Sequence, residues 1–139
     1  MDSTEDSLFE KALAKYQSGV EAKSLLRDFE DITKDHPTHS AGWTCLAWLQ
    51  LLCNRNEDAL RSARIAVKLN SKDPQSRINL SLALLETKAK GVRDHIDFVK
   101  RALVVVPELE KELKNSIEDG LMRKPDWPAL KKIQNWLFV

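Results

Sequence analysis

The sequence lacks the features by which several classes of protein are recognised. No run of apolar residues approaches the roughly 20 that cross a bilayer, since the longest runs are residues 46–49 and 102–106. The first six residues are acidic and contain no apolar run, so we expect no secretory signal peptide. Together these absences predict a cytoplasmic protein that has no contact with a membrane.

An excess of charge of one sign is also missing. The chain holds 22 Lys and Arg residues against 21 Asp and Glu residues, and neither half has the basic excess of a dedicated nucleic-acid-binding protein. There are only two cysteines, Cys45 and Cys53. Their spacing along one predicted helix places them roughly 12 Å apart, which is too far for a disulfide bond. We therefore expect neither nucleic acid as the main partner nor an intramolecular disulfide.

Residues that would carry catalysis or hold a cofactor are not grouped in the sequence. There is no phosphate-binding loop, no dinucleotide fingerprint and no pair of carboxylates in a predicted cleft. His36 and His39 lie close together, but zinc takes three or four ligands and no further His or Cys is near them. Cys45 has no neighbouring base to activate it as a nucleophile. We expect no enzyme activity, no metal and no cofactor.

What the sequence does contain is helical periodicity. Apolar residues recur at spacings of three and four, and no alternating strand pattern competes with them. Asp73 is expected to cap a helix that Pro74 begins. The fold class predicted is all-α with about eight helices. These cover residues 6–18, 20–34, 40–53, 57–69 and 93–105, with three more that begin near residues 74, 108 and 126.

A block centred on Trp43 recurs after about 34 residues. A period of this length with helical patterning inside it is typical of stacked helical hairpins. It predicts a binding surface before it predicts any chemistry. The residues that carry the recurrence are Trp43, Leu46, Ala47, Ala59 and Ala66 in the first copy, and Leu80, Ser81, Leu84, Ala102 and Pro107 in the second.

These positions resemble the tetratricopeptide repeat, a family whose unit is a pair of antiparallel helices. The resemblance is clearest over residues 40–107, with units at 40–73 and 74–107. It implies one domain over residues 1–139, in which antiparallel hairpins stack as a short right-handed solenoid. An irregular repeat would occupy residues 6–37, and residues 108–139 would form a divergent repeat or a capping hairpin. The second clear unit has two extra residues, which we expect in the turn around Gly91.

Tetratricopeptide arrays are similar in use, because the first helices of successive repeats line a concave groove that receives a peptide or a partner helix. The resemblance therefore implies a non-catalytic protein-binding module. Trp48 stands where the repeat's own packing does not require an aromatic residue. Two interpretations of it remain open: a half-exposed groove anchor, or a side chain that packs against residues 6–37 and touches no ligand. The implied groove residues are Thr44, Trp48, Gln75, Ile78, Asn79, Leu82, Lys111 and Lys114.

Two other functions stand as alternatives. Trp127, Trp136 and Phe138 concentrate apolar bulk at the end of the chain. Either Trp136 and Phe138 fold back on the preceding helix and complete the core, which we favour, or part of this apolar end stays exposed and makes this a self-associating structural protein, for example a homodimer. The basic stretch from Lys88 to Arg101 is the second alternative and predicts weak nucleic-acid binding, although two aspartates interrupt it. The sequence does not predict which protein is the partner.

Overall fold

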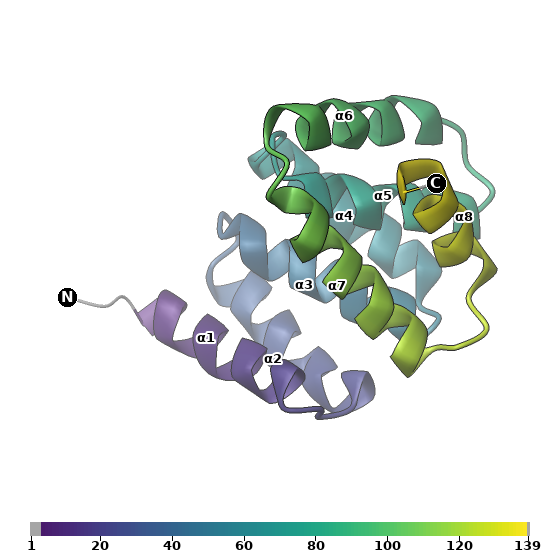
Figure 1. The fold of residues 1–139 in the computed structure, drawn as a ribbon. Coiled ribbons are helices and arrows are strands. Elements are labelled where there is room, and N and C mark those ends of the chain that lie inside the picture. Colours follow the sequence, from purple (N-terminus) through teal and green to yellow (C-terminus); the bar gives the residue numbers. More distant parts are fainter. Residues whose placement is uncertain (1–3, 139) are drawn as a thin grey trace.

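The computed structural model describes residues 4–138, and side chains from residue 7 onward. This part of the chain forms eight α-helices and no strand (Figure 1). The all-α prediction of stacked antiparallel hairpins is confirmed, and no predicted helix end is displaced by more than two residues. The helices are α1 (Thr4–Gln17), α2 (Ala22–Asp35), α3 (Ser40–Leu52), α4 (Asn56–Leu69), α5 (Pro74–Glu86), α6 (Val92–Val105), α7 (Leu109–Arg123) and α8 (Pro128–Phe138).

The repeat is visible in the backbone at the ends of α3 and α5. In the described chain, Asn54 and Lys88 are the non-glycine residues with positive φ, at 62° and 59°. The residues that follow them, Arg55 and Ala89, each donate a backbone N–H at 2.8 Å to the carbonyl five residues earlier. A left-handed residue followed by this hydrogen bond is the Schellman motif. Helices α3 and α5 therefore end in the same way, in step with the sequence period.

Two local signals in the sequence are confirmed. Asp73 caps α5, because its side chain accepts a hydrogen bond at 3.1 Å from the backbone N–H of Gln75, and Pro74 is the first helical residue. The turn between α5 and α6 spans residues 87–91, whereas the turn between α3 and α4 spans residues 53–55. Gly91 in the longer turn has a φ of 110°, which glycine adopts without the strain of a side chain. The two extra residues thus lie where they are predicted.

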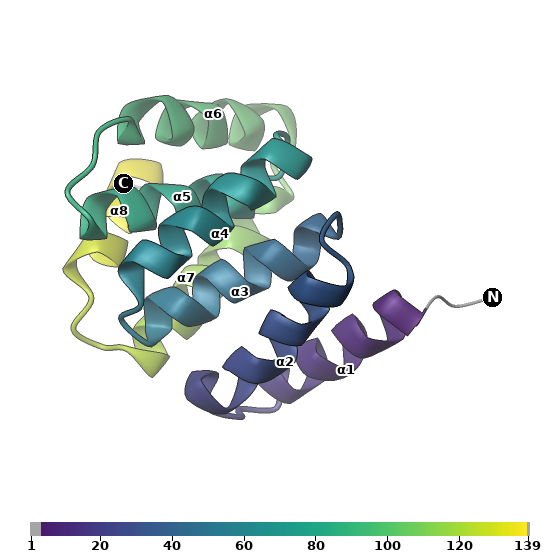
Figure 2. The same ribbon diagram turned by 180° about the vertical axis from the view of Figure 1, so that it is seen from behind.

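Small residues allow the helices in the middle of the stack to approach closely. Ala59, Ala63 and Ala66 form one side of α4 and are fully buried. Helices α3 and α5 both pack against α4, which lies between them when the molecule is seen from behind (Figure 2). None of the helices in residues 4–138 combines the length and apolar character that crossing a membrane requires.

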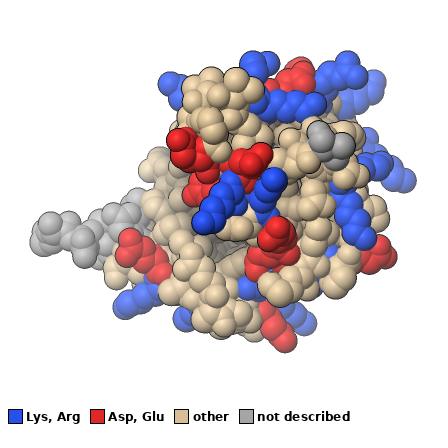
Figure 3. Space-filling view, viewed as in Figure 1, with Lys and Arg blue, Asp and Glu red and all other residues tan. Residues whose placement is uncertain are grey.

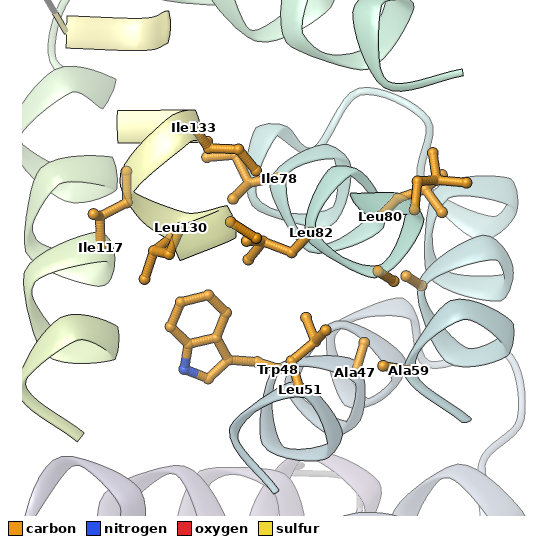
Figure 4. Packing of buried hydrophobic residues seen from close by; sticks show 14 of the residues in the cluster. Ala47, Trp48, Leu51, Ala59, Ile78, Leu80, Leu82, Ile117, Leu130 and Ile133 are labelled. Atoms are coloured by element: carbon orange, nitrogen blue, oxygen red, sulfur yellow. The ribbon is translucent and has the colours of Figure 1, made fainter. Parts of the chain in front are cut away.

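The last two helices turn back across the stack. Helix α7 passes over the side of α3, and α8 packs against α5, α6 and α7 (Figure 1). Ile117 of α7 and two residues of α8, Leu130 and Ile133, lie opposite Ile78 and Leu82 of α5 (Figure 4). The main core therefore extends from α3 and α4 through α5 and α6 to the C-terminal hairpin. A second cluster, around Phe29 and Leu49, joins α1 and α2 to α3.

Candidate partner-binding groove

A cavity of about 220 Å³ lies between the first helices of the successive hairpins. All but one of its lining residues come from α1, α3, α5 and α7, which are the helices that the tetratricopeptide resemblance assigns to the groove; the exception is Phe29 of α2. Figure 3 shows the face of the molecule on which α1 and α7 lie. The lining residues are Leu13, Tyr16, Gln17, Phe29, Thr44, Cys45, Trp48, Leu49, Gln75, Asn79, Ser116 and Asp119.

Tyr16, Asp119 and Arg123 join α1 to α7 beside this cavity, and we call them the Tyr16 cluster. The Tyr16 hydroxyl donates a hydrogen bond to the Asp119 carboxylate and accepts one at 2.8 Å from Nε1–H of Trp48. The Arg123 guanidinium lies 3.8 Å from the centre of the Tyr16 ring and 3.3 Å from the Asp119 carboxylate. It also donates to the backbone carbonyls of Tyr16 and Val20. The cluster fixes the separation of α1 and α7, and with it the width of the cavity.

The chemistry of the Tyr16 hydroxyl follows from this position. Burial raises the pKa of Tyr16 well above its ordinary value, and the hydrogen bond to Asp119 raises the pKa further. The neutral hydroxyl is therefore the form that the folded protein stabilises. The stabilisation is complete below about pH 10, the pKa of an unfolded chain's tyrosine. It is lost as the pH rises from there towards the higher pKa of the folded state.

Tyr16 is the only tyrosine in the chain, so ultraviolet titration of tyrosinate reports on this residue alone. We expect tyrosinate in the native protein to form at a higher pH than in the same protein unfolded in urea, where the midpoint is about 10. We also expect its formation to coincide with loss of helical circular dichroism. Equal midpoints in the folded and unfolded protein would show that the hydroxyl is solvated, and that the cluster does not hold α1 against α7.

Three of the predicted groove residues meet at the boundary between α3 and α5. The Asn79 side-chain amide donates to the Thr44 carbonyl at 2.9 Å and accepts from the Gln75 amide at 2.8 Å. The Thr44 hydroxyl lies 2.8 Å from the Ser76 hydroxyl. Asn79 and Thr44 are buried, and Gln75 is half-buried beside the cavity. This network holds α3 to α5 and leaves Gln75 as the member best placed to meet a bound segment.

The prediction that Trp48 is a half-exposed anchor is wrong. Its side chain is only 7% exposed, and its ring packs on that of Trp127 with centroids 5.5 Å apart. It also does more than pack against residues 6–37, because its ring lies against Gly120 of α7. Ile78 and Leu82 are fully buried as well. Trp48 still lines the cavity, but α7 and α8 cover Ile78 and Leu82, so the chain itself occupies the part of the groove assigned to these two residues.

Lys111 and Lys114 do not line the cavity. Both are exposed on α7, and Lys114 is directed towards α8, with its Nζ 5.2 Å from the centre of the Phe138 ring. The wall that α7 supplies consists of Ser116 and Asp119. The repeat spacing points to the correct helix, but to a side of it that faces away from the cavity.

The three aromatic residues of the C-terminal hairpin have different surroundings. Trp127 is buried in the core, so its assignment to a self-association surface is wrong. Phe138 is half-buried beneath Lys114. Trp136 is 42% exposed. Core closure by Trp136, the interpretation that the sequence favours, is therefore wrong, because Trp136 remains accessible; the aromatic residue of this hairpin that fills the core is Trp127.

Cys45 and His39, which the sequence offers as a possible nucleophile and a possible metal ligand, have structural surroundings. Burial raises the pKa of the Cys45 thiol to about 12, so the thiol is protonated at neutral pH and is a poor nucleophile. The His39 ring accepts a hydrogen bond at 3.2 Å from the backbone N–H of Gly42 and so caps α3. Within the described chain, no three His, Cys, Asp or Glu side chains are grouped so that they could hold a metal ion.

The sequence matches no model of a known protein family, and a search of curated proteins finds no similar sequence. The fold, however, is similar to solved structures. One is the crystal structure of the Yersinia enterocolitica type III secretion translocator chaperone SycD, in an alternative dimer, which aligns with a TM-score of 0.67 and 16% sequence identity. The alignment covers 100% of this chain and 98% of the SycD chain. The chain thus shares its all-helical fold with that protein over its whole length.

Proposed function

We propose that this chain is a non-catalytic protein-binding module that takes one apolar side chain of a partner segment into the cavity between α1, α3, α5 and α7. The observation that carries the proposal is the cavity itself, because it lies where the first helices of the hairpins meet. Leu13 and Leu49 supply apolar contacts there, and the half-buried Gln75 and Ser116 offer hydrogen bonds to the backbone of the segment.

The size of the cavity favours a side chain over a cofactor. Sites for small molecules of drug size are commonly about 300–1,000 Å³, and this cavity is about 220 Å³. A cavity of about 150 Å³ is already large enough to bind benzene. One aromatic or branched aliphatic side chain therefore fits, and such residues are the usual centres of binding energy in protein interfaces.

The similarity to SycD supports a protein partner. That protein is a translocator chaperone, and its chain superposes on nearly the whole of this one. We infer that this chain belongs among tetratricopeptide-like adaptors or chaperones. The affinity first assigned to Ile78 and Leu82 is then supplied by the cavity wall, to which Trp48 belongs. Self-association through the C-terminal hairpin stands second, because Trp127 is buried and leaves less apolar surface there than the sequence predicts.

The test fills the cavity with a side chain of the protein itself and measures the loss of affinity for peptides. Peptides are first selected from a random display library on the wild-type protein, and their affinities are measured by isothermal titration calorimetry. Ser116→Phe places a ring in the cavity from the wall of α7. We expect the affinity of the selected peptides to fall at least about tenfold, as when a central interface contact is removed.

Asn115→Phe is the matched control, because Asn115 is the neighbouring residue on α7 but is exposed and does not line the cavity. This variant should keep the wild-type affinity to within about twofold. Circular dichroism and thermal unfolding establish that both variants are folded. If Ser116→Phe is folded and binds the peptides as well as Asn115→Phe does, the cavity is not the site.

A further inference from the structure

A second cleft lies between α6 and α8 and shares no residue with the cavity of the groove. It has a volume of about 420 Å³ and is lined by Val92, Arg93, Ile96, Asp97, Lys100 and Trp136. Figure 1 shows α8 lying beside the N-terminal half of α6. The buried side chain of Ile96 and the half-buried Val92 give the cleft an apolar floor.

Trp136 is not among the residues that dock α8 on the core, and it remains exposed to solvent. The helix docks on the core through Ala129, Leu130 and Ile133, all of which are buried. Trp136 lies three residues beyond Ile133 and is 42% exposed. A tryptophan contributes more binding energy than most residues when a partner covers it. Its place at the edge of a preformed cleft therefore indicates an interaction surface.

The rim of the cleft carries positive charge. Arg93 and Lys100 line it from α6, and both are exposed. Lys132 is also exposed and lies one helical turn before Trp136, on the same side of α8. Asp97 is the one acidic residue in the lining. Figure 3 shows Lys and Arg side chains gathered along α6 and down the neighbouring edge of the molecule.

We propose that this cleft binds an acidic segment of a partner protein that carries one large apolar residue. The apolar residue packs on Trp136 and over Ile96, while carboxylates on either side of it pair with Arg93 and Lys100. The positive rim also increases the rate at which an acidic segment is captured. Single-stranded nucleic acid fits less well, because Trp136 offers one stacking surface where successive bases need several.

The proposal is tested with a fluorescein-labelled peptide in which one phenylalanine is flanked by glutamate and aspartate residues. Fluorescence anisotropy at low salt should show saturable binding to the wild-type protein. Replacing the phenylalanine with alanine, or the acids with their amides, should weaken the binding at least about tenfold. Raising the salt concentration should weaken the binding of the acidic peptide, because the rim charges are exposed to solvent.

Variants of the protein locate the binding. Trp136→Ala and the double variant Arg93→Glu/Lys100→Glu should each lower the affinity at least about tenfold. Met122→Ala and Lys111→Glu are matched controls, because these residues are exposed and lie outside the cleft. Both variants should bind the acidic peptide like the wild type. Ser116→Phe should do so as well, because it fills the groove cavity and leaves the cleft unchanged, so the two sites are tested independently.

Three results would overturn the proposal. The first is absence of saturable binding, or binding that is equal in Trp136→Ala and Met122→Ala. The second is tighter binding of an oligouridine probe than of the acidic peptide, lost in Trp136→Ala and in Arg93→Glu/Lys100→Glu, which would make the cleft a nucleic-acid site. The third is a wild-type dimer that Trp136→Ala converts to a monomer in sedimentation experiments, because the occupant is then a second copy of the chain.

Discussion

Replacing Trp48 with alanine is expected to lower the free energy of unfolding by about 3–5 kcal/mol, the range observed when a large aromatic side chain is removed from a core. Trp48 packs against Trp127 and Gly120, and its Nε1–H donates to the Tyr16 hydroxyl at 2.8 Å. Its removal therefore leaves a cavity and takes from the Tyr16 hydroxyl one of that group's two hydrogen-bond partners. Urea denaturation followed by circular dichroism measures the change.

Trp136→Ala is the control for this variant, because it removes the same side chain from an exposed position. Its expected effect on stability is below about 1 kcal/mol. The pair separates the contribution that a buried tryptophan makes to stability from that of an exposed one. If Trp48→Ala unfolds at the urea concentration of the wild type, the packing described for α3, α7 and α8 is incorrect.

The second large effect is expected at Gly120, where α7 passes closest to α3 and α8. A Cβ atom at this position would lie 2.7 Å from Cζ2 of Trp48 and 2.8 Å from Cδ2 of Leu130. Both neighbours are buried, so neither moves aside without disturbing the core. We expect Gly120→Val to lower the free energy of unfolding by about 3 kcal/mol, the upper end of the range for overpacked cores.

Glu118→Val is the matched control for this substitution. Glu118 is exposed on the same helix, and placing valine there costs less than about 1 kcal/mol of helix propensity. Thermal unfolding of both variants, measured by circular dichroism, shows whether the loss of stability at Gly120 comes from overpacking of the core or from the helix propensity of valine. A Gly120→Val variant as stable as Glu118→Val would mean that α7 does not approach Trp48 as closely as described.

Much of the fold is determined locally, and this part is predicted correctly from the sequence. The turns after α3 and α5 each contain a residue in the left-handed conformation, followed by the same backbone hydrogen bond. These two residues, Asn54 and Lys88, lie 34 positions apart. Asp73 and Pro74 fix the start of α5 through groups within two residues of each other. Such signals lie within one or two helical turns, where spacing and side-chain type are sufficient.

What the sequence does not predict depends on contacts between residues far apart in the chain. The position of α7 and α8 is set by pairs such as Trp48 with Trp127 and Tyr16 with Asp119, and no spacing rule connects them. For this reason Ile78 and Leu82, which the repeat pattern assigns to an open groove, are covered in the structure. The repeat pattern identifies the helices that form the groove, but packing decides which of their faces remain open.

The difference between Trp127 and Trp136 has the same origin. Both belong to the apolar end of the sequence, and composition alone does not distinguish them. Trp127 precedes α8 and enters the core beside Trp48, whereas Trp136 lies on the side of α8 that meets α6 at the solvent. The C-terminal hairpin therefore both closes the core and contributes one exposed aromatic side chain to a second surface.

The central claim is that a partner's apolar side chain enters the cavity between α1, α3, α5 and α7. Nuclear magnetic resonance measures this directly, by mapping the chemical-shift changes that a library-selected peptide causes in the wild-type protein. The account predicts the largest changes at Leu13, Leu49 and Ser116, together with contacts from the peptide's apolar side chain to the methyl groups of the two leucines. Changes confined to other surfaces, with these three residues unmoved at saturation, would contradict it.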